Sequence, residues 1–341
     1  MDIFGILSMI GGLALFLYGM EAMGAGLSKL SGGRMERLLE KLTSKRIMAV
    51  LLGAGVTAVI QSSSATTVMV VGFVNSGIMK LNQAVGIIMG ANIGTTITSW
   101  LLSLTGIQGS SFILKMLKPS SFSPILAIVG IIFIMFTKDE KKKDIGGIFL
   151  GFAILMYGME AMSGAVAPLA DNEKFTGILT MFSNPILGLL AGTILTAVIQ
   201  SSSASVGILQ ALCATGAVNF STALPIIMGQ NIGTCVTAII SSIGTSKNAK
   251  RAAAVHLFFN ISGTVIFMVV FYTLNTFVHF SFLNTAASPA GIAVIHSLFN
   301  IGATILLFPF ANLLEKMAIL AIPDKGSEVE EMEEEKINPD L

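Results

Sequence analysis

The stretch TAVIQSSSA occupies residues 57–65, and the same nine residues return without a change at 196–204. Each copy places a glutamine and three consecutive serines inside an otherwise apolar run. Hydroxyl and amide groups in apolar surroundings need hydrogen-bond partners or a ligand, because leaving them unpaired away from water is costly. The repeated stretch therefore predicts two equivalent polar sites, one in each half of the chain.

Two further motifs repeat with the same offset as this stretch. YGMEAM stands at 18–23 and 157–162, and MGANIGT at 89–95 returns as MGQNIGT at 228–234. A constant offset over three separate motifs indicates an internal duplication. Each copy contains, in the same order, a long apolar helix, two short apolar arms around QSSS, and a helix that carries NIGT.

The composition is that of an integral membrane protein. Hydrophobic residues make up 53% of the 341 residues, charged residues make up 11%, and the mean hydropathy is +0.83. Four long stretches contain no Asp, Glu, Lys or Arg, namely 47–79, 81–114, 185–246 and 252–314. Lipid selects for such runs. The net charge of +1, without a basic patch interleaved with aromatic residues, excludes nucleic acid as a partner.

The arms at 47–60 and 64–78 are too short to cross a bilayer comfortably. As helices they would be about 21–22 Å long, whereas the hydrocarbon core is about 30 Å thick. Each pair of arms is therefore predicted to form a re-entrant hairpin with QSSS at its tip, where protein or a watery cavity surrounds the irregular backbone. The Asn and Gly of NIGT predict a broken helix beside each hairpin.

About seven membrane crossings are expected besides the two hairpins. They are 4–25, 83–105, 121–136, 145–166, 222–243, 252–275 and 288–312. Three crossings precede the second copy, so the two copies enter the membrane from opposite sides. Lysine and arginine gather in the loops that this arrangement places inside, which puts the N-terminus outside and the C-terminus in the cytoplasm. The predicted fold class is an all-α polytopic membrane protein built from inverted repeats.

The chain is expected to divide into five segments. They are a first inverted repeat (1–108), a linking segment with one membrane helix (109–144), a second inverted repeat (145–246), two additional membrane helices (247–314) and an acidic cytoplasmic tail (315–341). The tail contains EVEEMEEEK, a charged run of the kind that stays disordered.

Inverted repeats whose broken helices meet at mid-membrane are typical of secondary transporters. The second arm of each hairpin begins as a helix after Ser64 or Ser203, so its free N–H groups and positive dipole end face the tip and favour an anion. The predicted substrate-binding residues are Gln61, Ser62, Ser63, Ser64, Gln200, Ser201, Ser202, Ser203, Asn92 and Asn231. No cofactor is expected. An enzyme is disfavoured, since the sequence has no GxSxG motif and no histidine near either QSSS.

An anion that enters a low dielectric without a counter-charge would cost on the order of tens of kcal/mol, and neither motif contains Lys or Arg. Cations are therefore expected to accompany the anion, and sodium is the economical hypothesis because the motifs offer oxygen ligands. The predicted sodium ligands are Ser63, Ser64, Thr66, Thr95, Ser202, Ser203, Ser205 and Thr234. Protons are the alternative coupling ion, and the intramembrane carboxylates Glu21 and Glu160 could serve as proton relays or as packing groups.

Two histidines and two cysteines also lie in charge-free stretches. His256 and His296 belong to a weaker echo, HLFFN and HSLFN. A histidine in a membrane helix is a functional candidate, but structural hydrogen bonds with Asn260 and Asn300 are favoured over that role. Cys213 and Cys235 show no metal-ligand spacing and are expected to be buried apolar side chains.

The segments QSSSATT at 61–67, QSSSAS at 200–205 and the two NIGT segments, in this order and spacing, resemble the type II sodium-phosphate cotransporter family and its bacterial members. The resemblance covers about residues 5–314 and implies sodium-coupled uptake of inorganic phosphate. It also implies that both QSSS segments line the phosphate and sodium sites, with the Asn and Thr of each NIGT nearby. Many bacterial members carry a C-terminal domain similar to the phosphate-signalling regulator PhoU. Only a short segment follows Leu313 in this sequence, so a member without that domain is expected.

The predicted function is therefore a sodium-phosphate symporter of the cell membrane that works by alternating access. A sodium-coupled carrier of another small oxyanion or of a dicarboxylate, and a passive anion channel, are the alternatives. The expected partners are phosphate, sodium and the lipid bilayer, and the sequence leaves a homo-oligomer open.

Overall fold

The computed structural model describes residues 3–31, 45–107, 119–169 and 172–323, and in these residues the chain forms helices and no strand. Six helical stretches in this part are long and apolar enough to cross a membrane. They are Ile3–Leu30, Leu81–Gly106, Glu140–Leu169, Phe220–Ser241, Lys247–Val278 and Pro289–Ala321. The prediction of an all-α polytopic membrane protein is confirmed.

Each QSSS segment lies at a sharp break between two short helices. The first hairpin consists of α3 (Arg46–Ile60) and α4 (Ser63–Asn75), and the second consists of α10 (Pro185–Ile199) and α11 (Ser202–Cys213). The glutamine at each break adopts the left-handed conformation, with φ of 61° at Gln61 and 59° at Gln200. A left-handed residue followed by an extended serine ends one helix and lets the next begin directly afterwards. We call 61–64 the first tip and 200–203 the second tip.

The helices that carry NIGT are continuous, so the predicted breaks are wrong. α5 (Leu81–Ser103) and α12 (Phe220–Ser241) run through both NIGT segments without interruption. The glycines serve close packing instead of an opening of the backbone. A Cβ at Gly94 would lie 2.5 Å from the carbonyl oxygen of Ala54, and one at Gly233 would lie 2.5 Å from that of Thr193.

Within each copy, the first hairpin arm and the NIGT helix pack backbone to backbone. Gly53 of α3 lies against the carbonyl of Ile87 in α5, and Gly192 of α10 lies against the carbonyl of Ile226 in α12. Both partners are displaced along the chain by the same offset as the repeated motifs, so the duplication in the sequence is also a duplication of contacts. The two copies are therefore built alike at their centre.

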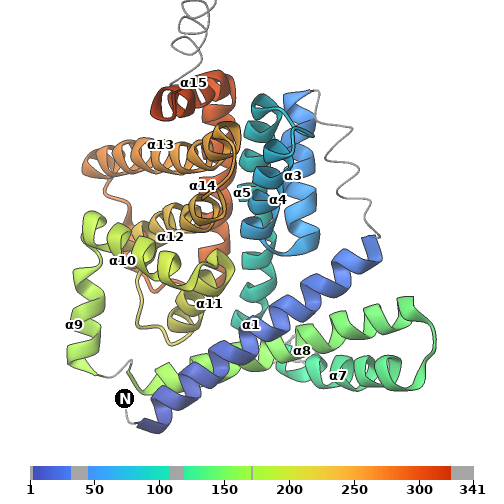
Figure 1. The fold of residues 1–341 in the computed structure, drawn as a ribbon. Helices are drawn as coiled ribbons and strands as arrows, with labels where there is room; N and C mark the ends of the chain where they lie inside the picture. Colours follow the sequence, from blue (N-terminus) through green and yellow to red (C-terminus); the bar gives the residue numbers. More distant parts are fainter. Residues whose placement is uncertain (1–2, 32–44, 108–118, 170–171, 324–341) are drawn as a thin grey trace, which may run out of the picture.

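The long helices α1 (Ile3–Ser31) and α8 (Glu140–Val166) cross each other in opposite directions, side by side in Figure 1. A Cβ at Gly12 would lie 3.0 Å from the carbonyl oxygen of Gly158, and a Cβ at Gly19 would lie 2.6 Å from that of Gly151. Going forward along α1 from Gly12 to Gly19, the contacted residue moves backward along α8 from Gly158 to Gly151, so the two helices are antiparallel. Since α1 and α8 are equivalent elements of the two copies, the copies are inverted.

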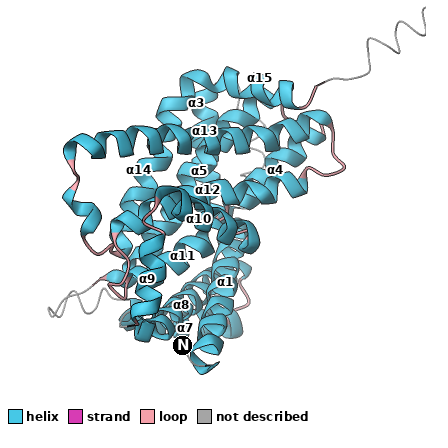
Figure 2. Cartoon of the chain, turned by 90° about the vertical axis from the view of Figure 1, so that its left-hand side faces the viewer, coloured by secondary structure: helices cyan, strands magenta, loops and turns pink. Residues whose placement is uncertain are grey.

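In both views of the chain, α1 and α8 lie with α7 (Pro119–Phe136) at one side of the molecule, while α13 (Lys247–Val278) and α15 (Ala311–Ala321) lie at the other (Figures 1 and 2). Between the two groups are the hairpins, α5, α12 and α14 (Pro289–Leu307). Short 3-10 turns follow α5, α8 and α14, and another one follows α13 in the connection to α14.

The structure departs from the sequence expectations at three peripheral places. The third predicted crossing, 121–136, is α7, which is shorter than the six candidate spans, so its crossing stays a prediction. Between the predicted crossing 145–166 and the second hairpin, the structure contains an additional helix, α9 (Glu173–Met181), which meets α10 at a bend of 100°. The expected acidic tail begins inside α15, and its remainder from 324 lies outside the described residues.

Candidate functional site

The two tips meet at a buried point between the two copies. The hydroxyl oxygens of Ser63 and Ser202, which are equivalent residues of the duplication, lie 3.5 Å from each other. Both side chains are buried, with 3% and 5% of their surface exposed. The Ser64 hydroxyl also reaches the backbone carbonyl of Gln200 at 3.5 Å. The prediction that the QSSS segments come together is therefore confirmed by their geometry.

Each tip presents the beginning of a helix to this point. Ser62 and Ser201 are the N-caps of α4 and α11, and their side chains accept hydrogen bonds from the amides of Ala65 and Ala204 at 3.1 and 3.2 Å. Helix geometry leaves the first N–H groups after the cap, such as that of Ser63, without an intrahelical acceptor. Two positive helix ends thus converge at the serine pair, and such an arrangement favours a negatively charged ligand.

A hydroxyl pair braces the two arms of each hairpin just below the tip. Thr57 donates to Thr66 at 3.0 Å, and Thr196 donates to Ser205 at 2.8 Å. Thr66 and Ser205 are predicted ligands, whereas their partners Thr57 and Thr196 were not predicted. The overlooked signal was in the repeated stretch itself, because its first residue is a threonine in both copies. Two pairs of buried hydroxyl oxygens are suitable ligands for a small hard cation.

The two glutamines are held differently. Gln61 is buried, its side-chain oxygen accepts from Thr98 at 2.9 Å, and its amide donates to the carbonyl of Ala58. Gln200 is exposed, and its backbone carbonyl accepts from Thr237 at 3.4 Å. Thr98 and Thr237 are equivalent residues that sequence analysis missed, although a threonine at this position of both copies could have indicated them.

The Asn and Thr of NIGT lie on helices that pack beside the tips, but their hydrogen bonds stay within those helices. Thr95 and Thr234 donate to the carbonyl one helical turn earlier, and Asn231 does the same. The side-chain amide of Asn92 is buried and has no hydrogen-bond partner within the described part of the chain. α5 and α12 each contact both α4 and α11, so both helices that carry NIGT pack against the second arms of the two hairpins. The contact of these Asn and Thr side chains with a ligand stays a prediction.

A cavity of about 400 Å³ reaches the first tip. Its lining comes from α1 and from the first hairpin: Met20, Glu21, Gly24, Ala25, Ser28, Ile60, Gln61, Ser62 and Ala65. Ala65 is exposed there, whereas the equivalent residue of the second hairpin, Ala204, is completely buried. Glu21 brings a carboxylate to the same cavity as the hydroxyl of Ser62. The two tips therefore have the same core but different access.

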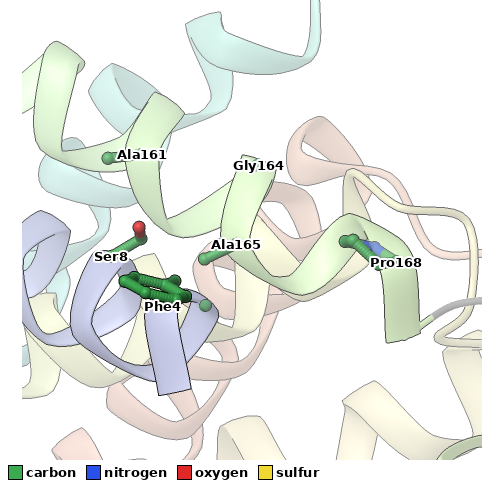
Figure 3. Close-up of a pocket in the computed structure, with 7 residues that line it drawn as sticks. Phe4, Ser8, Ala161, Gly164, Ala165 and Pro168 are labelled. Carbon is green, nitrogen blue, oxygen red and sulfur yellow. The ribbon is translucent and has the colours of Figure 1, made fainter. Parts of the chain in front are cut away.

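A second hollow lies between the first turns of α1 and the last turns of α8, away from both tips. Figure 3 shows the residues that line it, and apart from the hydroxyl of Ser8 they are apolar or small side chains: Phe4, Gly5, Ser8, Ala161, Gly164, Ala165 and Pro168. This lining offers no group that would hold an oxyanion. The buried meeting point of the two tips, and not this hollow, is taken as the candidate site.

Comparison with known proteins agrees with this geometry. The family model described as Na+/Pi-cotransporter matches residues 15–164 and 154–288, one match for each copy. The chain is 29% identical over 315 residues to "Uncharacterized protein YqeW" of Bacillus subtilis, which covers 92% of this chain and 97% of that protein. No solved structure matches the chain.

Two further relatives have names that state a transport activity. "Putative inorganic phosphate export protein YjbB" of Salmonella typhimurium is 27% identical over 323 residues, covering 94% of this chain and 56% of that protein. "Sodium-dependent phosphate transport protein 2A" of Rattus norvegicus is 39% identical over 113 residues, covering 31% of this chain and 17% of that protein. The chain thus spans about half the length of the export protein.

Proposed function

Because the chain belongs to the Na+/Pi-cotransporter family, we propose that it carries inorganic phosphate across the cell membrane together with sodium, and that it imports phosphate. The observation that carries the proposal is the contact between Ser63 and Ser202, which brings two helix N-termini of opposite copies to one buried point. Phosphate would accept hydrogen bonds from the free N–H groups and hydroxyls of both tips.

Sodium supplies the positive charge that the tips lack. The segments 47–79 and 185–246 contain no Lys or Arg, so helix ends alone would have to balance a phosphate ion. A helix end contributes only about half an elementary charge. The braced hydroxyls, Thr57 with Thr66 and Thr196 with Ser205, offer oxygen ligands next to the anion. Cotransport of sodium is therefore the economical way to bring phosphate into a low dielectric.

The different surroundings of the two tips support alternating access as part of the proposal. The arms of 15 and 13 residues in the first hairpin are too short to span about 30 Å of hydrocarbon, so we place both hairpins as re-entrant elements. Ala65, next to the first tip, is exposed to a cavity, whereas at the second tip Ala204 is buried and Gln200 is exposed instead. In an inverted repeat, exchange of these two environments would open the same site toward the opposite side of the membrane.

Export of phosphate is the second candidate, since the Salmonella relative that covers 94% of this chain is named as an export protein. The same site would serve either direction, because gradients decide the direction of a symporter. A carrier of another small oxyanion or of a dicarboxylate would differ in which anion competes most strongly with phosphate. A passive anion channel would differ because its phosphate flux would not depend on sodium.

Uptake into proteoliposomes tests the proposal. We expect radiolabelled phosphate to accumulate above its outside concentration when sodium is high outside, and to stop accumulating when potassium replaces sodium. Unlabelled phosphate should compete more strongly than sulfate or a dicarboxylate. Downhill flux that does not respond to sodium would contradict symport and would favour the channel. Stronger competition by another anion would contradict phosphate as the substrate.

The same proteoliposomes test the direction of phosphate transport. With a sodium gradient of either sign and the protein's orientation determined by proteolysis, net phosphate movement that always follows sodium supports symport. In the cell, where the sodium gradient points inward, this coupling gives import. Phosphate that moves against sodium would instead support export.

A further inference from the structure

A second polar pattern recurs outside the hairpins. The spacing His-x3-Asn-x3-Thr occurs in HLFFNISGT and again, later in the chain, in HSLFNIGAT. Residues at this spacing lie on one face of a helix. We call His256, Asn260 and Thr264 the α13 stripe, and His296, Asn300 and Thr304 the α14 stripe; all six side chains are buried.

The two stripes lie on helices that contact each other. A Cβ at Gly263, which precedes the last residue of the α13 stripe, would lie 3.1 Å from the Cβ of Ala303, which precedes the last residue of the α14 stripe. The α14 stripe lies against α5, where His296 meets Ser99, and the α13 stripe lies against α12, where Asn260 meets Cys235. Each stripe therefore backs the NIGT helix of one copy.

The α14 stripe is largely satisfied by protein groups. The ring nitrogen Nδ1 of His296 lies 2.6 Å from the hydroxyl of Ser99, and Thr304 donates to the carbonyl of Asn300 at 2.8 Å. The amide of Asn300 donates to the carbonyl of His296 at 2.8 Å, which leaves only its side-chain oxygen without a partner within the described residues. The expected bond between histidine and asparagine exists, but it uses the histidine backbone.

The α13 stripe is not satisfied. Within the described part of the chain, His256 Nδ1, Asn260 Oδ1 and Thr264 Oγ1 have no hydrogen-bond partner, although each residue has only 1% of its surface exposed. The amide of Asn260 already donates to the carbonyl of His256 at 3.0 Å and lies 3.3 Å from the sulfur of Cys235. The free oxygens of Asn260 and Thr264 can accept, and Nδ1 of His256 accepts when the ring proton is on Nε2.

The difference between the stripes has a cause in the sequence. The position of α12 that corresponds to Ser99 in the second copy is Ala238, and it is buried. The partner that holds His296 in the first copy is thus missing in the second. Free acceptors in an apolar membrane interior are costly unless a ligand or water fills the place.

We propose that the α13 stripe binds a sodium ion at a site separate from the hairpin tips. Asn260 Oδ1 and Thr264 Oγ1 lie one helical turn apart, about 6 Å between their Cβ atoms, which lets one ion bridge both oxygens. His256 adds a third acceptor when its proton is on Nε2. The free amide oxygen and hydroxyl select a hard cation over an anion. The inference rests on the proposed sodium coupling and adds a second place for the coupling ion.

Direct binding of radioactive sodium to the purified full-length protein in nanodiscs, without phosphate, tests this site. Thr264→Val keeps the shape of the side chain and removes its oxygen, and we expect it to weaken sodium binding about tenfold. Thr264→Ser restores the oxygen and should keep wild-type affinity. The matched variant Thr304→Val, in the satisfied stripe, should leave sodium affinity unchanged. Asn260→Asp, which adds a negative charge next to the ion, should bind sodium more tightly.

The outcomes separate this inference from the proposed function. Wild-type affinity in Thr264→Val would overturn the α13 site and would mean that water alone occupies it, while sodium-coupled transport would stand. Equal weakening in Thr264→Val and Thr304→Val would assign both threonines to packing and also overturn the site. If Thr264→Val does not fold, unchanged affinity in Asn260→Asp overturns the site. Absence of sodium binding in the wild-type protein would overturn the coupling and the site together.

Discussion

The first and second tips lie in the same nine-residue sequence and have the same internal geometry, but they face different surroundings. The left-handed glutamine, the capping serine and the hydroxyl pair below the tip recur in both hairpins. The surroundings differ along the second arm. Gly207 of α11 lies against the ring of Phe16 from α1, whereas the equivalent Val68 of α4 is exposed.

This difference shows that the motif determines the hairpin while its neighbours determine its access. The α1 and α8 pair covers α11 of the second hairpin and leaves a cavity at Ala65 of the first. Each repeat is a similar unit in a different position relative to α1 and α8, as expected for one state of an alternating-access cycle.

The largest effect is expected from substitutions in the close contact between the first hairpin arm and the NIGT helix, which both copies share. Gly90→Ala and Gly229→Ala would drive a methyl group into the carbonyls of Val50 and Leu189, and each should destabilise the protein by about 3 kcal/mol. Thermal unfolding in detergent measures the loss. Gly72→Ala, where a Cβ meets nothing within 4 Å, is the matched control and should have little effect. A large loss in only one of the first two variants would show that the halves are not built alike.

A smaller effect should separate the glutamines. Gln61→Ala removes the acceptor of Thr98 in a buried place and should lower phosphate uptake about 100-fold, because a buried donor loses its partner. Gln200→Ala removes an exposed side chain and should lower uptake by about tenfold or less. Both proteins should be expressed and folded. Initial uptake rates in proteoliposomes measure the loss in each variant. Equal losses would mean that the two glutamines act alike on the substrate.

The smallest effect concerns the threonines that hold these glutamines. Thr98→Val should reduce the apparent phosphate affinity about tenfold, since it frees the Gln61 side chain. Thr237→Val loses only a bond of 3.4 Å to a backbone carbonyl, so a change of about twofold is expected. Titration of uptake against phosphate concentration measures both. A larger effect of Thr237→Val than of Thr98→Val would mean that Thr237, and not Thr98, positions the more important glutamine.

Much of this architecture could be predicted from the sequence, because the constant offset between the paired motifs records the duplication directly. Short arms and a run of polar residues between them were enough to indicate the hairpins. The continuity of α5 and α12 could not be predicted, since glycine in NIGT serves equally for opening a helix and for close packing. The close approach of Gly94 to Ala54 and of Gly233 to Thr193 shows that these glycines serve packing.

The asymmetry of the tips lay beyond sequence reasoning for a different reason. The identical sequence of the two motifs does not predict that Ala65 is exposed and Ala204 is buried, because their exposure depends on helices far away in the chain. The threonine partners of the glutamines were also missed, although their identity in both copies was visible. Comparison of the two copies position by position would have found them.

Disulfide formation between positions 63 and 202 tests the central claim most directly. In the double variant Ser63→Cys with Ser202→Cys, mild oxidation in lipid should join the two positions, since their side-chain oxygens lie 3.5 Å apart in the structure. Peptide mass mapping identifies the bond, and the native Cys213 and Cys235 are buried and free. The pair Ser76→Cys with Ser202→Cys, which moves one thiol to the far end of α4, should stay reduced. A disulfide in the first pair alone is the predicted result; no disulfide at 63 and 202 would contradict the meeting of the two tips.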